Sequence, residues 1–347
     1  MRFMREIREP RGARHVWDTR TTRGPCRAAR RRRPEPRPRG SWIGTRRLRA
    51  PSSAVLAALV LVPATANAVD GTLEISPVCA VQTGCFAGDA AGFPVTISAS
   101  GSYRLTGDLV VPDANTTAIQ VTASDVRLDL NGFAIVRSGC QGATFDCTPP
   151  SGSGFGVQTT TSTANGVSVR NGSVVGMGST GISVGTAGEI AEVHLRWNRT
   201  DGVFAGALST VRDNIANQNG FRGLFVGTGS TVSGNTVSQN ASDGIATSFG
   251  CTVSGNTTSF NGGDGLDIGT GSTVVDNTAY DNDQNGIRVA SDSTVQRNTV
   301  RANGSYGLSL SSSTAYRGNV INDNGVGTVN GGINLFSNSC NGTSTCP

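Results

Sequence analysis

The sequence predicts an all-β fold, a single-stranded right-handed parallel β-helix in which about ten coils of 21 residues stack into a solenoid. Three observations support this prediction: a repeat of fixed length, columns of Asn and Gly at fixed places within it, and short alternating apolar runs between those columns. Each observation predicts a different part of a coil, namely its length, its bends and its strands.

The repeat runs from Ser209 to about Ile321 without a slip in register. Its units begin STVRDN, STVSGN, CTVSGN, STVVDN and STVQRN. A fixed period of this size indicates a stack of like units, each of which contacts only its neighbours. Left-handed β-helices follow a six-residue period, which 21 does not match, so we expect the right-handed form.

Asn and Gly recur at three places in each unit. Both residue types adopt left-handed backbone angles at low cost, so we expect a bend of the chain at each column. Asn side chains stacked at the spacing of β-strands, about 4.8 Å, can also bond to one another along the stack. The three columns are Asn214, Asn235, Asn256, Asn277, Asn298 and Asn319; Asn198, Asn219, Asn240, Asn261, Asn282, Asn303 and Asn324; and Gly181, Gly202, Gly223, Gly244, Gly265, Gly286 and Gly307.

Between the bends, apolar residues alternate with small polar ones, which predicts strands with one face inward. No helical spacing is present, and Gly and Asn are too frequent for helices. The inward columns are Val211, Val232, Val253, Val274 and Val295, and Leu224, Ile245, Leu266, Ile287 and Leu308.

These repeats resemble those of the right-handed parallel β-helix (pectate-lyase-like) superfamily, secreted bacterial type. The resemblance extends over about residues 95–335 and includes TISASGSYRLTGDLVVP (96–112), AIQVTASDVRLDLNGFAIV (118–136) and GVSVRNGSVVGMG (166–178). The resemblance predicts the fold but does not single out one activity, because the superfamily contains lyases, hydrolases, epimerases and binding proteins.

The chain divides into five predicted segments. Residues 1–44 are a basic leader, rich in Arg and Pro, that cannot form a core; a wrongly assigned start codon is one explanation. Residues 45–68 have the basic flank, short apolar stretch and Ala-Asn-Ala site of a signal peptide, which predicts a secreted, periplasmic or cell-surface bacterial protein. The remaining segments are an N-terminal cap and first strands at 69–115, the β-helix at 116–335 and a disulfide-closed tail at 336–347.

Cleavage after residue 68 would change the net charge of the protein from positive (+5) to negative. The mature part holds 12 arginines and no lysine against 20 carboxylates, a net charge of −8. An acidic surface argues against nucleic acid as a partner, and the absence of lysine excludes Schiff-base chemistry. The apolar stretch 54–62 is too short to span a bilayer, so we expect no membrane span after cleavage, and we expect a monomer.

Six of the seven mature cysteines form three local pairs. In an exported protein such pairs indicate disulfides, here at the N-terminal cap, around the insertion 138–154 and in the C-terminal tail. The seventh, Cys251, occupies a column of serines and fits a Ser-sized position, although its fate stays open. The pairs are Cys79/Cys85, Cys140/Cys147 and Cys340/Cys346.

The best candidate binding surface flanks the Gly column, where alternation points residues outward. The candidate catalytic residues are Asp243, Asp264, Asp267 and Arg288, and the candidate substrate-binding residues are Phe204, Phe225, Asp201 and Arg222. Exposed aromatic rings one coil apart suit the flat face of a sugar. The alternative is structural, because Asp and Asn before Gly are ordinary turn residues and Arg288 beside Asp267 can be a surface ion pair.

Asp243 and Asp264 lie one coil apart, so their carboxylates are expected about 5 Å from each other. Such a pair either shares a proton, as in glycoside hydrolysis, or binds a cation, for which Ca²⁺ is the candidate. No other cofactor or metal is expected. Copper-handling β-helix proteins of nitrous-oxide reductase maturation share the repeat type, but His194 and Met177 are the sole His and Met of the mature part, which argues against metal handling.

Two functional hypotheses follow. The first is a secreted protein that binds a polysaccharide or cell-surface glycan, or has a structural role, without catalysis. The second is a polysaccharide-active enzyme, either a lyase, an epimerase or a glycoside hydrolase, that uses the Asp/Arg face. The first is preferred because the sequence lacks the superfamily's familiar catalytic sets, such as Gly-His-Gly or Arg-Ile-Lys.

Overall fold

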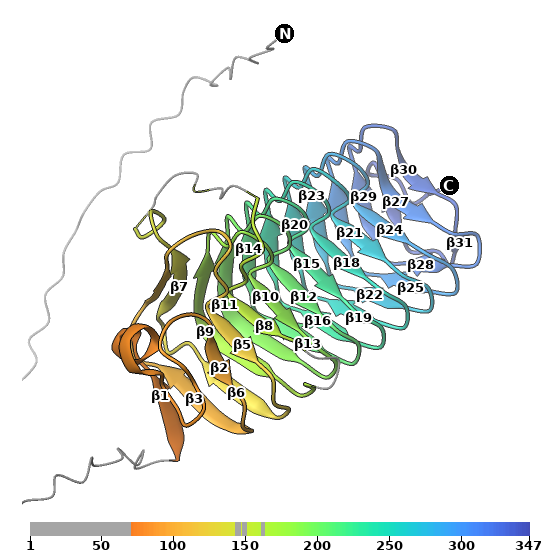
Figure 1. Cartoon of the computed structure of the whole chain (residues 1–347). Helices are drawn as coiled ribbons and strands as arrows, with labels where there is room; N and C mark the ends of the chain where they lie inside the picture. The colour runs from red at the N-terminus through yellow and green to blue at the C-terminus, as the bar shows by residue number, and fades with distance from the viewer. Residues whose placement is uncertain (1–70, 143–146, 148–150, 161–163) are drawn as a thin grey trace, which may run out of the picture. The chain divides into compact units, whose positions relative to one another are not determined.

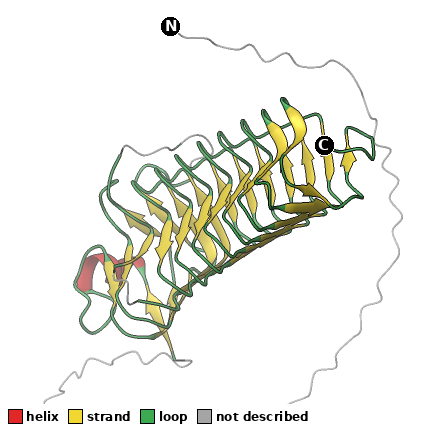
Figure 2. Ribbon diagram, turned by 90° about the vertical axis from the view of Figure 1, so that its right-hand side faces the viewer, coloured by secondary structure: helices red, strands yellow, loops and turns green. Residues whose placement is uncertain are grey.

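The computed structural model describes residues 71–142, 147, 151–160 and 164–347, and these form a right-handed parallel β-solenoid of about 11 coils. The predicted fold is confirmed. The predicted leader (1–44) and signal peptide (45–68) lie outside the described residues. Figure 2 shows strands on the faces of the stack, loops along its edges and one short helix at its N-terminal end.

That helix is a single π-helical turn, η1 (Cys79–Thr83), next to the first strand. Among the described residues, no helix has the length and apolar character needed to cross a bilayer.

Each coil contributes one strand to an 11-stranded sheet, called sheet B here, whose strands lie side by side along the stack (Figure 1). Neighbouring strands pair in parallel, and from β10 onward the register advances by 21 residues per coil, as in the pair Leu224↔Ile245. Its strands are β2 (Val95–Ile97), β5 (Ile119–Val121), β8 (Val157–Thr159), β10 (Ile182–Val184), β12 (Val203–Ala205), β15 (Leu224–Val226), β18 (Ile245–Thr247), β21 (Leu266–Ile268), β24 (Ile287–Val289), β27 (Tyr306–Leu310) and β30 (Gly327–Asn330).

The other strands form a 21-stranded sheet, sheet A, to which most coils contribute two strands separated by a bend. The strands before the bend are β1 (Thr72–Ile75), β3 (Gly101–Leu105), β6 (Val126–Asp129), β13 (Thr210–Arg212), β16 (Thr231–Ser233), β19 (Thr252–Ser254), β22 (Thr273–Val275), β25 (Thr294–Gln296), β28 (Ala315–Arg317) and β31 (Ile333–Asn334). Those after it are β4 (Leu109–Val111), β7 (Ala134–Arg137), β14 (Ile215–Asn217), β17 (Thr236–Ser238), β20 (Thr257–Ser259), β23 (Thr278–Tyr280), β26 (Thr299–Arg301), β29 (Val320–Asn322) and β32 (Ser339–Cys340). Two longer strands, β9 (Ser168–Val175) and β11 (Glu189–Arg196), pair with strands on both sides of the bend.

The core follows the predicted columns. The inward valines from Val211 to Val295 and the Leu/Ile column from Leu224 to Leu308 are all 0% exposed. The hydrophobic effect thus acts along the whole stack, because each coil closes the apolar face of its neighbours.

The Asn columns form buried ladders. Asn235 donates its backbone N–H (3.0 Å) and its Nδ2 (2.9 Å) to Oδ1 of Asn256, and its Nδ2 also bonds the carbonyl of Val211 at 2.9 Å. The same pattern recurs in the second column, for example from Asn240 to Asn261. Buried backbone groups at each bend therefore find partners in the adjacent coils.

The expectation that the Asn and Gly columns themselves adopt left-handed angles is wrong. The residue before each Asn takes the positive φ, for example Asp213 (56°) and Gln239 (56°). The Gly column is required by close approach: a Cβ on Gly223 would lie 2.2 Å from Cγ1 of Val237 and 2.7 Å from the carbonyl oxygen of Gly244. Glycine is needed there because the next coil lies against it, not because of its φ.

The three predicted disulfides are confirmed at Cys79–Cys85, Cys140–Cys147 and Cys340–Cys346. Cys251 is a free, buried cysteine, as its serine column suggests. Both ends of the described chain join the sheets: β1 pairs with β3, and β32, which contains Cys340, pairs with β29.

We predict that Asn256→Ala lowers the free energy of unfolding by about 3 kcal/mol, because it removes the acceptor for the backbone N–H and Nδ2 of Asn235 and the donor to the carbonyl of Val232. Thr252→Ala, at an exposed position of the same coil, should change it by no more than about 0.5 kcal/mol. Urea denaturation followed by circular dichroism measures both, and equal effects would contradict a stabilising role for the ladder.

Candidate functional site

The outer face of sheet B carries four of the eight candidate residues in one register column. Its members are Ser183, Phe204, Phe225, Ala246, Asp267, Arg288 and Ser309, each paired with the next across adjacent strands. The alternation of the strands places them outward, because the residues on either side face the core. The column has an aromatic half and an ionic half, separated by Ala246.

In the aromatic half, Phe204 and Phe225 stack with ring centroids 5.1 Å apart and an angle of 20° between their planes. Phe204 is 40% exposed. The guanidinium carbon of Arg222 lies 4.4 Å from the Phe225 ring centroid and 4.6 Å from that of Phe221. Two parallel rings with a cation packed over one of them form a rigid, partly exposed platform.

Asp201 holds Arg222 in place. Arg222 donates from Nε to Oδ1 of Asp201 at 3.0 Å, and the aspartate side chain is only 8% exposed. Burial raises the pKa of Asp201, and the hydrogen bonds and charge of Arg222 partly offset that rise. The ion pair thus positions the guanidinium over the aromatic platform.

In the ionic half, Arg288 bridges two carboxylates. Its Nε donates to Oδ2 of Asp264 at 2.7 Å and its Nη2 to Oδ2 of Asp267 at 2.6 Å. Burial raises the pKa of Asp267, the charge of Arg288 lowers it, and the charges of Asp243 and Asp264 raise it again. Asp267 is the more accessible acid of the bridge, with 29% of its side chain exposed against 3% for Asp264.

Asp243 and Asp264 have a different geometry from the expected facing pair. Oδ1 of Asp243 accepts the backbone N–H of Asp264 at 2.9 Å, and Oδ1 of Asp264 accepts both the backbone N–H and Nδ2 of Asn285 at 2.8 Å. The turn residues before the Gly column therefore bond the backbone of the following coil, the structural alternative raised by the sequence. With Arg288 on its other oxygen, Asp264 already has a cationic partner.

That arrangement does not suit the expected Ca²⁺ ion. Calcium takes six to eight oxygen ligands at roughly 2.4 Å. Within residues 71–142, 147, 151–160 and 164–347, no group of three or more His, Cys, Asp or Glu side chains could hold a metal ion.

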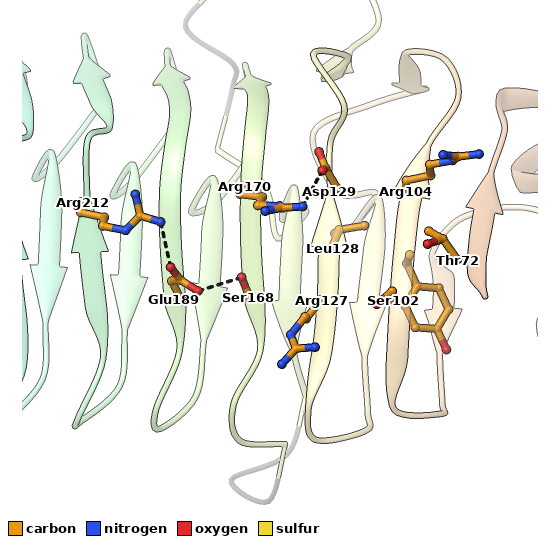
Figure 3. Close-up of a pocket in the computed structure, with 11 residues that line it drawn as sticks. Thr72, Ser102, Arg104, Arg127, Leu128, Asp129, Ser168, Arg170, Glu189 and Arg212 are labelled. Carbon is orange, nitrogen blue, oxygen red and sulfur yellow. Dashed lines mark hydrogen bonds and ion pairs between the residues drawn. The ribbon is translucent and has the colours of Figure 1, made fainter. Parts of the chain in front are cut away.

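A second concave surface lies on sheet A, on the strands before the bend, and sequence reasoning missed it (Figure 3). We call it the arginine groove; its volume is about 390 Å³. Its lining consists of Thr72, Ser102, Tyr103, Arg104, Arg127, Leu128, Asp129, Ser168, Arg170, Glu189 and Arg212.

Irregular coil lengths hid this groove in the sequence. Arg127 pairs with Ser102, 25 residues earlier, and with Ser168, 41 residues later, whereas the clear repeat begins only near Ser209. The outward positions could have been found from the alternation with buried Tyr103 and Leu128. The sequence could not show which of these outward residues become neighbours across coils, because the insertion 138–154 shifts the register.

We predict that Arg222→Gln raises the Asp201 pKa further, because it removes the groups that lower it. Stability contributed by a raised acid pKa is complete below the unfolded value of 3.8 and is lost as pH rises through the folded pKa. The variant should therefore lose stability relative to wild type between about pH 4 and about pH 7. Carbon-detected NMR titration and unfolding at both pH values test this, with Arg317→Gln as the control; an unchanged Asp201 titration would contradict the predicted coupling.

Several solved structures are similar in fold. The A-module of mannuronan C-5 epimerase AlgE4 from Azotobacter vinelandii has a TM-score of 0.52 at 18% identity, over 65% of this chain and 70% of that one. Pectate lyase Pel9A has a TM-score of 0.51 at 15% identity, over 77% and 79%. A mutant of the periplasmic alginate epimerase AlgG has a TM-score of 0.53 at 13% identity, over 77% and 72%. At these identities the similarity shows the fold alone.

No curated protein is significantly similar to the chain in sequence. Two family descriptions match it: "Right handed beta helix region" over residues 246–346, and "Periplasmic copper-binding protein (NosD)" over residues 117–290. The second match covers 174 of the 347 residues, and the chain belongs to this NosD family of β-helix proteins.

Proposed function

We propose that this protein acts outside the cytoplasm and binds a polysaccharide along the outer face of sheet B without catalysis. The observation that carries the proposal is the stacked pair Phe204 and Phe225, partly exposed and rigidly held. Sugar rings present flat apolar C–H faces, which pack well on aromatic rings of this kind.

The rest of the column suits a chain that lies parallel to the solenoid axis. Phe225 and Arg288 are three strands apart, about 14 Å at the usual strand spacing. Ala246 between them leaves room, and Asp267 and Arg288 offer polar groups to sugar hydroxyls at the far end. A linear ligand could thus stack at one end and hydrogen-bond at the other.

The comparisons support the same class of ligand. The names of the similar structures refer to mannuronan, alginate and pectate, all of them polysaccharides. The NosD family and the alginate epimerase AlgG are both described as periplasmic, which agrees with the predicted signal peptide. Both descriptions support the proposal that this protein acts in the periplasm or outside the cell.

A copper function does not fit the described residues, although the family name refers to copper. Copper is bound by His, Cys and Met side chains. Here Met177 is 1% exposed within the core, the thiol of Cys251 is buried and donates to the carbonyl of Gly227, and His194 stands alone on β11. Because these three side chains form no common site, we assign no copper chemistry to the described part of the chain.

A second candidate function is catalysis at Asp267, as a lyase, an epimerase or a glycoside hydrolase. It is favoured by one observation, the raised pKa of a half-buried acid beside Arg288. Asp264 is the weaker candidate, because both of its oxygens already accept hydrogen bonds. Binding is the preferred proposal because Arg288 already pairs with Asp267, and Asp243 and Asp264 accept hydrogen bonds from the backbone of the following coil.

We predict that Phe225→Ala weakens binding of the best ligand from an array of bacterial and plant oligosaccharides about tenfold, or about 1.4 kcal/mol. Phe204→Ala should act similarly, because the two rings form one platform. Phe336→Ala, which removes a phenylalanine that is 78% exposed in the C-terminal tail, is the matched control and should leave affinity unchanged. Isothermal titration measures all three, and an equal loss in the control would contradict the assignment of the site.

Catalysis is tested separately. Wild-type protein incubated with alginate or polygalacturonate, with and without Ca²⁺, should give no unsaturated product absorbing in the ultraviolet and no change in uronate composition or chain length. If any of these activities appears and Asp267→Asn abolishes it while leaving the melting temperature unchanged, the second candidate function is correct and the non-catalytic proposal is wrong.

A further inference from the structure

We propose that the arginine groove on sheet A binds an oxyanion carried by a sugar chain, a carboxylate or a sulfate, with Arg127 as its principal ligand. This site lies on a different sheet from the aromatic platform and does not depend on the function proposed for sheet B.

Ion pairs with neighbouring carboxylates hold most of the arginines of the groove. Arg170 donates to Oδ2 of Asp129 at 3.0 Å. Arg104 pairs at 2.7 Å with Glu74, which is not one of the residues that line the groove. Arg212 pairs with Glu189 at 3.0 Å, and also with Glu192 and Asp213 outside the groove. Three of the four arginines of the groove are thus neutralised by neighbouring strands.

Arg127 is the exception. It is exposed, and within the described part of the chain it forms no ion pair or side-chain hydrogen bond. Asp129 lies two residues along the same strand, but Figure 3 shows the guanidinium turned away from it. An anionic ligand can therefore form a charge-assisted hydrogen bond with the Arg127 guanidinium without displacing a partner among the described residues.

The nearby carboxylates cannot easily neutralise Arg127, because each already has donors. Asp129 accepts hydrogen bonds from Arg170, from Nδ2 of Asn171 at 3.1 Å and from the backbone N–H of Asn131 at 2.7 Å. Glu189 accepts from Arg212 and from the hydroxyl of Ser168 at 3.3 Å. Moving either acid to Arg127 would break these bonds.

The surroundings of Arg127 suit a sugar. Ser102 and Ser168 lie directly beside it in register, one strand away on each side. The hydroxyl of Ser102 can donate to an oxyanion, and that of Ser168, which donates to Glu189, can accept from a sugar hydroxyl. The volume of about 390 Å³ lies in the range of small-ligand sites. A guanidinium matches the paired oxygens of a carboxylate or a sulfate in a two-pronged contact.

The position is also unusual for this protein. The mature chain has a net charge of −8, yet four of its 12 arginines line this one groove. The net negative charge disfavours the approach of an acidic polymer, and the guanidinium of Arg127 offsets part of that repulsion within the groove. That contrast favours an acidic glycan over a neutral one at this site.

The test uses four probes with the mature protein: polygalacturonate for carboxylate, dextran sulfate for sulfate, unmodified dextran, and inorganic sulfate. We expect wild type to bind at least one of the two acidic polymers and Arg127→Gln to weaken that binding about tenfold. Arg127→Lys should lose less, because it keeps the charge but not the two-pronged contact. Binding should weaken with added salt, because the contact is exposed to solvent.

The matched control is Arg317→Gln, which removes an exposed arginine from the same face of sheet A at its opposite end, where the partner is Gln296. It removes the same charge and should change affinity less than about twofold. If Arg317→Gln and Arg127→Gln weaken binding equally, the interaction is a general effect of charge and the proposal is wrong. It is also wrong if neither acidic polymer binds, or if inorganic sulfate binds and the polymers do not.

Failure of this proposal can be told apart from failure of the sheet B proposal. Phe225→Ala should leave the Arg127-dependent binding of acidic polymer intact, since the two residues lie on different sheets. Melting temperatures close to wild type for Arg127→Gln and Arg127→Lys, both at an exposed position, show that a lost affinity is not a lost fold.

Discussion

The structure depends on one constraint: every coil must satisfy the polar groups of its bends inside a stack that excludes water. The Asn ladders meet this constraint, because each side chain accepts from the asparagine one coil before it and donates to backbone carbonyls and to the asparagine one coil after it. Left unpaired, each of these buried polar groups would cost about 1–3 kcal/mol. From Asn198 onward the ladders therefore fix the number of residues between bends, and with it the length of the coil.

A fixed coil length turns the outer surface into columns. Residues 21 positions apart become neighbours one strand spacing from each other, so a local change in sequence produces a local feature on a regular face. Two phenylalanines in successive coils become a stacked platform, and an aspartate followed by an arginine becomes an ion-paired bridge. The same scaffold can hold unrelated sites on different faces, which explains why this fold shows so little about activity.

Two of the aspartates that directly precede the Gly column, Asp243 and Asp264, illustrate how the stacking of coils occupies side chains that could otherwise act on a ligand. Asp243 and Asp264 bond the backbone of the following coil, and Arg288 compensates the charge of Asp264. Their carboxylates thus contribute mainly to the stack, whereas Asp267, three residues after Asp264 and within β21, keeps 29% of its side chain exposed. The groove on sheet A shows the opposite case, because its ion pairs leave Arg127 without a partner among the residues described.

The sequence alone determined the fold, the inward columns, the three disulfides and the stacking of Phe204 on Phe225, because all of these follow from a constant period or from short local spacing. At the Asn columns it placed the left-handed angles one residue too late, since an asparagine that bonds through a buried ladder and one that takes a positive φ look the same in a repeat. At the Gly column it predicted such angles where close approach of the next coil requires glycine instead. Only the tertiary structure decided which acids are saturated by hydrogen bonds, because that depends on rotamers and on donors from the next coil. It alone revealed the arginine groove, because Ser102, Arg127 and Ser168 become neighbours across coils of unequal length, and an insertion removes the period that would have aligned them.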